Sequence, residues 1–583
     1  MTNLGSNSND GGKPRETVIL VLKEERFEVE KQKLIDKSQY FDALLSMNYL
    51  EYGQTEHIIN YDISPIVLKD FIDWIHHDKI IFTSATSYNI EEIRSLDRLL
   101  ILLELSVLFA TDKLIEDITD RLERHFMSPK YVIDIWLLAQ ELNINVLRDL
   151  SLAVCLDRFD ELPLDSICEL SKKHFIRLIG NINLRATESH LLDITREWMN
   201  HHHDFTVSLD IIENKKAKIL QGVMSCENIN GEQYIHCWDG NDFFELTSFE
   251  YPTDVVEKSH VTGRPLEGVQ ITARRYDLYL CGGEYGIGSK KFNKNVWRYS
   301  LISKKWILET VMPVERRHMI TVFLKDKLYL VGGVGRLRQD RQTIDIYDIY
   351  TGVWTSSRAK ITSFTGVPQH FIFNDKLIIQ QNNTNMIYHM YFPDEDVCET
   401  LSAFISCTPN INANISESYG IRILRHTTAD IPILTLKHMS CYIDVVDQDE
   451  MALKVVTETC NVEGCNNIIN TFLKSYHERV EGRDIYKEEN SDLYYLLHAK
   501  CAEWFLTPFF HFTHSFNYKD RPAILLCKGT DERDPLRKLH LHSIPIQEPR
   551  KFRSLLLTKK NLTKKLFNIH HPAYLHTTNL DHI

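Results

Sequence analysis

Three short groups of residues have the side chains that metal or phosphate binding uses. His201-His202-His203 are consecutive, Cys460 and Cys465 have four residues between them, and Gly288-Ser289-Lys290 ends in lysine. Adjacent histidines on a helix point in different directions, which favours a solvated helix end. The cysteine pair lacks a matching second pair, and a phosphate loop needs lysine directly after glycine. We therefore expect no metal site, no cofactor and no catalytic constellation.

Composition and charge narrow the class of protein further. The chain has 583 residues, of which 43% are hydrophobic and 25% charged, so we expect several domains with cores of their own. A formal net charge of −13 argues against general binding to nucleic acid or to an anionic membrane. The most apolar run, Leu99–Ala110, is too short to span a bilayer. That run is expected to form a buried helix.

Three features bear on location. Met1–Thr17 is polar and lacks the apolar core of a secretory signal. The twelve cysteines are scattered without a repeating framework, as expected in a reducing compartment. Arg550–Lys565 has seven basic residues and no acid, so a nuclear-localisation signal and a polar terminal extension are the alternatives there. We expect a cytoplasmic protein, with the nucleus as the alternative location.

The first elements of the chain are predicted to be a strand pair followed by helices. Val18–Leu22 and Phe27–Val29 flank a charged turn and favour a hairpin. Apolar residues follow at helical spacing up to Leu45, with Ser38 as a helix cap. A short strand at His57–Tyr61 precedes further helices up to residue 126.

This order resembles the BTB/POZ domain over residues 16–126. The family's motif is similar to Ser38-Gln39-Tyr40-Phe41-Asp42-Ala43-Leu44-Leu45, and a second, looser match is Phe71-Ile72-Asp73-Trp74-Ile75. The resemblance implies a homodimer, and it implies that Tyr49 and Glu51 bind cullin-3. Residues 1–15 show no helical periodicity, although many dimeric members have a helix there, and Glu30 replaces the family's usual histidine. We expect a disordered N-terminus and leave the dimer geometry open.

Residues 127–215 have a wholly helical pattern. Apolar residues recur at helical spacing from Ile135 onward, and Leu162-Pro163 marks a break between helices. Ala139-Gln140-Glu141-Leu142, Phe159 and Trp198 occur in the order found in the BACK domain, which this segment resembles. In that family the domain sets the distance between cullin and substrate.

Residues 222–560 contain short apolar runs and a repeat of about fifty residues. Leu278–Gly283 matches Leu328–Gly333 fifty positions later, and Asp375–Ile379 is a third copy without the glycine pair. Ile524–Gly529 is a further eroded copy. The glycine pairs indicate close backbone approach, and the tyrosine and tryptophan seven residues apart would fill the space between sheets. The residues that carry this pattern are Gly282, Gly283, Tyr299, Trp306, Gly332, Gly333, Tyr347 and Trp354.

The pattern resembles the kelch repeat, in which each unit is one blade of a β-propeller. Tyr234–Trp238 would then either start the first blade or complete the last. The expected fold is a multidomain α+β chain: an α/β BTB domain, an all-α BACK domain, an all-β kelch propeller of about six four-stranded blades, and a C-terminal tail at 561–583.

The loops after the two intact glycine pairs are basic, which predicts a substrate-binding surface for an acidic peptide. The first loop has three lysines against Glu284, and the second has three arginines against Asp340. The predicted substrate-binding residues are Lys290, Lys291, Lys294, Arg336, Arg338 and Arg341. Ordinary solvated loops are the alternative.

The order of the three domains resembles the substrate adaptors of cullin-3 RING ubiquitin ligases. The resemblance implies that the BTB domain binds cullin-3, that the propeller captures a target protein, and that other subunits transfer ubiquitin. The alternative is an actin-associated or other cytoskeletal scaffold without cullin binding. A third interpretation is a decayed adaptor whose target capture has changed, since several kelch units have lost their glycine pairs.

Overall fold

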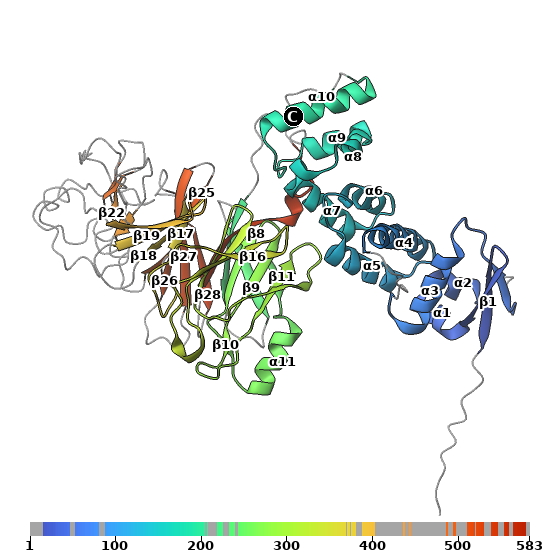
Figure 1. Cartoon of the computed structure of the whole chain (residues 1–583), viewed down its shortest axis with the longest axis horizontal. Helices are drawn as coiled ribbons and strands as arrows, with labels where there is room; N and C mark the ends of the chain where they lie inside the picture. The colour runs from blue at the N-terminus through green and yellow to red at the C-terminus, as the bar shows by residue number, and fades with distance from the viewer. Residues whose placement is uncertain are drawn as a thin grey trace, which may run out of the picture. The chain divides into compact units, whose positions relative to one another are not determined.

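The structure is a computed structural model in which two compact units fold separately. One unit comprises Met1–Ala217 with Ala573–Ile583, and the other comprises Lys218–Pro572 (Figure 1). The chain therefore passes between the units at two points. The structure describes residues 16–46, 53–80, 88–204, 207, 219–225, 232–238, 243–368, 370–373, 375–380, 387–402, 435–437, 442–444, 485–487, 494–496, 510–518, 521–529, 538–545, 553–558 and 564–578.

The first unit begins with a three-stranded sheet in the order β2-β1-β3. Strand β1 (Thr17–Leu22) pairs antiparallel with β2 (Glu25–Glu30) and parallel with β3 (Glu56–Ile58). Alternate side chains of β1, from Val18 to Leu22, are buried, as the period of two in a strand requires. The predicted hairpin is confirmed.

Ser38 divides the first predicted helix into α1 (Lys31–Lys37) and α2 (Gln39–Leu44). Its backbone is extended, and its hydroxyl accepts a hydrogen bond from the Phe41 amide at 3.2 Å. The same hydroxyl donates to the Phe109 carbonyl at 2.6 Å. The predicted cap is therefore confirmed, and it also attaches α2 to the end of α4 (Tyr88–Leu108).

An aromatic cluster lies at the centre of this part of the unit. Phe41 and Phe71 lie 4.8 and 5.0 Å from Phe109, measured between ring centroids. Phe71 belongs to α3 (Pro65–His77), which begins with Ser64 as its cap and Pro65 in its first turn. Helix α5 (Asp112–His125) follows α4 and completes the predicted helical stretch. The apolar motif residues Phe41, Leu45, Phe71, Trp74 and Ile75 are core residues.

The helical middle is confirmed as a series of short helices. They are α6 (Val132–Glu141), α7 (Asn145–Asp157), α8 (Leu164–Cys168), α9 (Lys172–Ile179) and α10 (Glu188–His202). Pro163 stands immediately before α8, at the predicted break. Trp198 of α10 stacks on Phe175 with ring centroids 4.6 Å apart. No helix in the described ranges is long and apolar enough to cross a membrane.

The second unit contains, within the described ranges, six four-stranded sheets. Five are antiparallel throughout, and the β21–β24 sheet has one parallel pair, β22 with β23. The bounds of β4 to β20 in these sheets are β4 (Ile219–Ser225), β5 (Gln233–Trp238), β6 (Phe243–Phe249), β8 (Gln270–Arg274), β9 (Asp277–Cys281), β11 (Asn295–Ser300), β12 (Trp306–Val311), β13 (Ile320–Leu324), β14 (Lys327–Val331), β15 (Ile344–Asp348), β16 (Val353–Ser356), β17 (His370–Phe373), β18 (Lys376–Gln380), β19 (Ile387–Phe392) and β20 (Val397–Ser402).

The remaining strands of the six sheets lie toward the end of the chain. They are β21 (Thr435–Lys437), β22 (Tyr442–Asp444), β23 (Ile485–Lys487), β24 (Tyr494–Leu496), β25 (Phe510–Tyr518), β26 (Arg521–Gly529), β27 (Lys538–Pro545), β28 (Arg553–Thr558) and β29 (Lys564–His570). Smaller elements of the unit are α11 (Thr253–Thr262), and β7 (Leu266–Glu267) paired with β10 (Glu284–Tyr285).

The fifty-residue repeat corresponds to repeated sheet geometry. Tyr299 pairs with Trp306 across β11 and β12, and Tyr347 pairs with Trp354 across β15 and β16. The ring centroids are 5.1 and 5.0 Å apart in the two pairs. In the third copy Tyr391 pairs with a cysteine, Cys398, at the same register position. The alignment of the three copies is confirmed.

The end of the chain differs from the expected C-terminal tail at 561–583. Lys564–His570 form strand β29, which pairs with β4 in the order β29-β4-β5-β6. Arg553–Thr558, within the basic segment for which a polar extension was one alternative, form β28. Tyr234–Trp238, which was expected to start the first blade or complete the last, lies within β5 of this sheet. Charged residues on edge strands were mistaken for a solvated extension.

Candidate binding surface

The two glycine pairs turn the chain sharply at the ends of β9 and β14. Gly282 has φ of +67° and Gly332 has φ of +62°, both in the left-handed region. A Cβ atom on Gly282 would lie 2.5 Å from the backbone oxygen of Arg316. On Gly332 it would lie 2.5 Å from the ring of Phe364. Only glycine fits without a shift of these neighbours. The close backbone approach inferred from the sequence is therefore confirmed at Gly282, whereas the neighbour of Gly332 is a side chain.

The loop after β9 contacts the buried carboxylate of Glu284. Glu284 accepts a hydrogen bond from the Lys290 amide at 2.8 Å and pairs with Arg317 Nε at 3.0 Å. Asn293 is also buried and donates to the Gly282 carbonyl at 3.1 Å. Glu284, the acidic residue of this otherwise basic loop, forms its ion pair with Arg317. The lysine side chains of the loop therefore do not owe their positions to Glu284.

The loop after β14 is held by its own backbone. The amide of Gly335 donates to the Gln339 carbonyl at 2.8 Å, and the Arg341 amide donates to the Gly333 carbonyl at 2.8 Å. The Arg341 side chain lies over Gly335, where a Cβ would come within 2.7 Å of its Nε. Leu337, at the tip of this loop, is 80% exposed. The loop thus presents one apolar side chain between charged neighbours.

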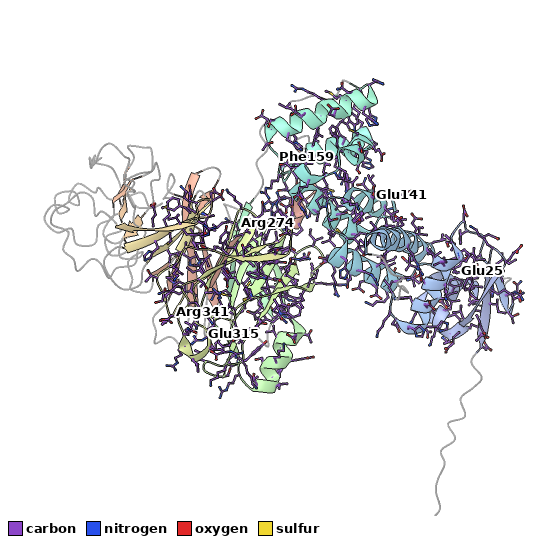
Figure 2. All side chains as sticks on the ribbon, viewed as in Figure 1. Glu25, Glu141, Phe159, Arg274, Glu315 and Arg341 are labelled. Carbon is purple, nitrogen blue, oxygen red and sulfur yellow. The ribbon has the colours of Figure 1, made fainter. Side chains whose placement is uncertain are left out.

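Glu315 joins the two predicted basic loops. Its carboxylate pairs with Lys294 Nζ at 2.9 Å and with Nε of Arg336. Glu315 is buried, whereas the two basic side chains are about half exposed, at 47% and 59%. Figure 2 labels Glu315 and Arg341 close together in this view, with Arg274 at a distance from both. The carboxylate of Glu315 neutralises part of the positive charge that was predicted for this surface.

The six predicted cations therefore fall into three groups. Lys294 and Arg336 are paired with Glu315. Lys290, Lys291 and Arg338 are exposed and form no ion pair with any residue that the structure describes. Arg341 is half-buried, and its Nε has no hydrogen-bond partner within the described part of the chain. The exposed charge on this surface is therefore smaller than the sequence suggested.

A buried arginine lies beneath this surface. Arg316 is fully buried, pairs with Asp345 and donates to the carbonyls of Leu330 and Gly332 at 3.3 and 3.1 Å. Burial lowers the pKa of Arg316 and the nearby charge of Arg341 lowers it further, against the opposite effect of Asp345. Sequence analysis missed Arg316, Arg317 and Glu315, which form a charged run just before β13. This run of three charged residues was the feature of the sequence that could have identified them.

The tyrosine and tryptophan residues of the repeat connect neighbouring sheets. Trp306 Nε1 donates to the Glu250 carbonyl at 2.7 Å, and Trp354 Nε1 donates to the Thr310 hydroxyl at 3.0 Å. Tyr347 donates to a carboxylate oxygen of Glu309 at 3.2 Å. Each contact runs to the preceding sheet or to the residue that follows it. The predicted structural role of these residues is confirmed.

Two other predictions concern residues elsewhere. Tyr49 and Glu51, the predicted cullin-3 contacts, lie outside the described residues, as do Cys460 and Cys465. In the His201–His203 run, the His202 ring stacks on Trp198 at 4.3 Å and contacts the Cys168 carbonyl at 2.7 Å. His203 ends α10 in the left-handed conformation. These histidines therefore lie at a helix end. Within the described ranges no cluster of His, Cys, Asp or Glu is arranged to hold a metal.

Comparison with known protein families identifies one domain. Residues 13–125 match the family model of the BTB/POZ domain. This range agrees with the 16–126 predicted from the sequence and covers the β2-β1-β3 sheet and helices α1–α5. In the comparison with curated proteins, no relative matches the chain.

Proposed function

We propose that this BTB/POZ-containing chain is a substrate-recognition adaptor of a cullin-3 RING ubiquitin ligase. The observation that carries the proposal is the BTB/POZ domain at residues 13–125, a domain type consistent with such an adaptor role. In the proposed assembly the BTB/POZ domain binds cullin-3 and pairs with a second copy of itself. The chain performs no chemistry, and other subunits transfer ubiquitin.

We propose further that residues 127–215 are a BACK domain and that the second unit is a six-bladed kelch propeller. Three features support the propeller. The first sheet is built from both ends of the unit, since β29 pairs with β4, which is the arrangement that would close a ring of sheets. In addition, β29 contacts both β8 and β25, which belong to the second and sixth sheets. The glycine pairs and the Tyr–Trp pairs are also typical of kelch blades.

The target would bind to the loops that follow the glycine pairs. Lys290, Lys291 and Arg338 supply exposed positive charge there, and Leu337 supplies an exposed apolar side chain. An acidic peptide suits this charge on a chain that is acidic as a whole. Held in this way, a target would gain proximity to the ubiquitin carrier. A dimer would carry two such surfaces, which raises avidity without new contacts.

The experiment that tests this proposal is a binding assay between the full chain and the N-terminal region of cullin-3. We expect the unchanged chain to bind and the Tyr49→Ala/Glu51→Ala variant to lose at least about tenfold in affinity, as for a hot spot. Glu28→Ala, which removes an exposed carboxylate from β2 of the same domain, is the matched control and should bind like the unchanged chain.

Each outcome separates the candidate functions. Loss of binding in the double variant alone supports the adaptor and the position of its cullin contact. Equal binding by all three proteins would move the contact elsewhere on the domain. No binding by the folded, unchanged chain would remove ubiquitin transfer from its function and favour a scaffold protein.

A further inference from the structure

The last described residues of the chain are bound to the helical part of the first unit. Residues 573–578, here called the C-terminal segment, follow β29 directly and belong to the first unit with the helices. Leu575 within this segment is fully buried. A fully buried leucine in so short a segment needs a specific site that buries it.

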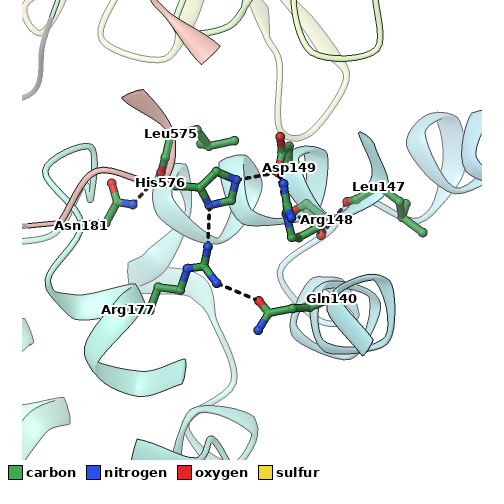
Figure 3. A network of polar contacts seen from close by, with 9 residues as sticks. Gln140, Leu147, Arg148, Asp149, Arg177, Asn181, Leu575 and His576 are labelled. Atoms are coloured by element: carbon green, nitrogen blue, oxygen red, sulfur yellow. Dashed lines mark hydrogen bonds and ion pairs between the residues drawn. The ribbon is translucent and has the colours of Figure 1, made fainter. Parts of the chain in front are cut away.

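The helical unit binds the backbone of the C-terminal segment through one short loop. Asn181 Nδ2 donates to the Leu575 carbonyl at 2.6 Å (Figure 3), and Asn183 Nδ2 donates to the Tyr574 carbonyl at 2.8 Å. The Ile182 amide donates to the Thr577 carbonyl at 3.2 Å. Three consecutive residues of the loop thus each bind a main-chain oxygen of the segment. This is the type of contact by which proteins hold peptides.

The two asparagines of the loop are almost fully buried. Asn181 has no exposed surface and Asn183 is 2% exposed. A buried amide that loses its acceptor costs about 1–3 kcal/mol in desolvation. Without the C-terminal segment, the buried amides of Asn181 and Asn183 would lose the carbonyl acceptors that they bind in the structure.

Both ring nitrogens of His576, in the C-terminal segment, contact side chains of the helices. His576 Nε2 lies 2.7 Å from Asp149 Oδ1, and Nδ1 lies 3.0 Å from Arg177 Nη2 (Figure 3). Arginine can only donate, so Nδ1 accepts that hydrogen bond and the imidazole N–H at Nε2 donates to the carboxylate. Asp149 comes from α7 and Arg177 from α9. The two helices together select a histidine side chain.

We propose that Asn181, Ile182, Asn183, Asp149 and Arg177 form a peptide-binding site whose ligand is the chain's own C-terminal segment. The site uses one apolar anchor, Leu575, one histidine, His576, and three main-chain oxygens. The ligand is therefore a short peptide of the class apolar–histidine, defined by Leu575-His576. The inference does not depend on the proposed function, because it concerns neither cullin nor target.

The C-terminal segment is joined through His571 and Pro572 to β29, which completes the first sheet of the second unit. The peptide site acts as a latch that holds this segment on the helices of the first unit, and a competing peptide can open it.

The test uses the full chain and a version that ends at His571, so that β29 is kept. The probe is a fluorescein-labelled peptide with the sequence of residues 571–578, and its anisotropy is measured on titration. We expect saturable binding to the shortened chain and at least about tenfold weaker binding to the full chain. The covalently attached segment has an effective concentration of order millimolar, so it outcompetes the added peptide.

Two controls test the proposed contacts. A peptide with His576→Ala should bind the shortened chain about tenfold more weakly, since it loses the hydrogen bonds to Asp149 and Arg177. A scrambled peptide of the same composition should not bind. Equal binding of the three peptides, or equal binding of the original peptide to the full and shortened chains, would overturn the proposal.

A second measurement covers the case in which the shortened chain does not fold. Hydrogen exchange at the Ile182 amide, which donates to Thr577, is followed in the full chain with and without His576→Ala. We expect exchange at Ile182 to become at least about tenfold faster in the variant, because the latch opens more often. Unchanged exchange at Ile182 would show that His576 does not hold the segment and would refute the latch.

Discussion

Trp306 donates a hydrogen bond from its indole nitrogen to the backbone oxygen of Glu250, 2.7 Å away, and so ties the second sheet to the residue that follows the first. The Trp306 ring also packs against Tyr299 at 5.1 Å and Phe249 at 5.5 Å. The Trp306 side chain therefore packs within its own sheet and against the first sheet, and it adds a polar contact to the residue that follows the first sheet.

We expect Trp306→Phe to lower the free energy of unfolding by about 1–2 kcal/mol, because the phenyl ring keeps part of the packing but leaves the Glu250 carbonyl without its donor. Thermal denaturation checks this. Val311→Ala, at a half-exposed position of the same strand, is the control and should change stability by less than about 0.5 kcal/mol. Equal effects of the two substitutions would contradict the role of the indole.

The glycines allow a comparison between strain and steric clash. Gly282 and Gly288 both have left-handed backbones, with φ of +67° and +85°, but only Gly282 faces a backbone atom within 4 Å. We expect Gly288→Ala to cost about 1 kcal/mol from φ strain alone and Gly282→Ala to cost more than about 3 kcal/mol. Urea denaturation of both variants measures the difference. Similar urea midpoints for the two variants would show that the backbone near Arg316 can move to make room for the added Cβ atom.

A buried ion pair stabilises the BTB/POZ domain. Asp70 is 5% exposed and pairs with Arg98 through two hydrogen bonds. Burial raises the pKa of Asp70, and the guanidinium of Arg98 opposes this shift. We expect Arg98→Met to lose about 3–5 kcal/mol at pH 7, because it leaves a buried carboxylate without this partner.

The pH dependence of that variant follows from the sign of the shift. Without Arg98 the pKa of the Asp70 carboxyl rises further, so the folded state takes up a proton more readily than the unfolded chain. The Arg98→Met variant should then recover stability relative to the unchanged protein as the pH is lowered from 7 to 5. Asp70→Asn added to Arg98→Met should remove this dependence. A defect that is constant with pH would contradict the account.

The pKa of the Asp149 carboxyl is shifted in the opposite direction from that of Asp70. Burial alone would raise its pKa, but hydrogen bonds from His576 and Arg148 outweigh burial and lower it. The contribution of the ionised carboxylate is therefore present above the unfolded pKa of about 3.9 and is lost as the pH falls through the lower, folded value. We expect Asp149→Asn to destabilise the protein by about 1–2 kcal/mol at pH 7, and this effect should shrink progressively as the pH falls below about 3.9. Calorimetry at several pH values checks this.

Glu315 limits the positive charge on the loop surface. Replacement by glutamine keeps its size but removes the ion pairs with Lys294 and Arg336. We expect Glu315→Gln to speed association with an acidic peptide several-fold at low salt and to steepen its salt dependence. Charge reversal of Arg336, Arg338 and Arg341 together should slow it. Stopped-flow measurements that show no change in either variant would place the target elsewhere.

The parts of the fold that were predictable share a local signal. Ser38 lies before a helical pattern, Pro163 interrupts one, and the glycine pairs recur at a fixed spacing. Each of these residues acts on the backbone next to it. Contacts between residues far apart in the sequence have no such local pattern. Glu315 is 21 residues from each of its two basic partners, and His576 is 427 residues from Asp149. The sequence around Glu315 or His576 does not predict which residue each one contacts.

The pairing of β29 with β4 has a consequence for synthesis of the protein. More than half of the 583 residues separate the two strands, so the edge of β4 stays unpaired until the ribosome has made residues 564–570. At about 5–20 residues per second that interval lasts tens of seconds. During it, β4 presents an open edge to which other nascent chains can add a strand. A transcript with an early stop codon would make this exposure permanent, and cellular quality control would then remove the product.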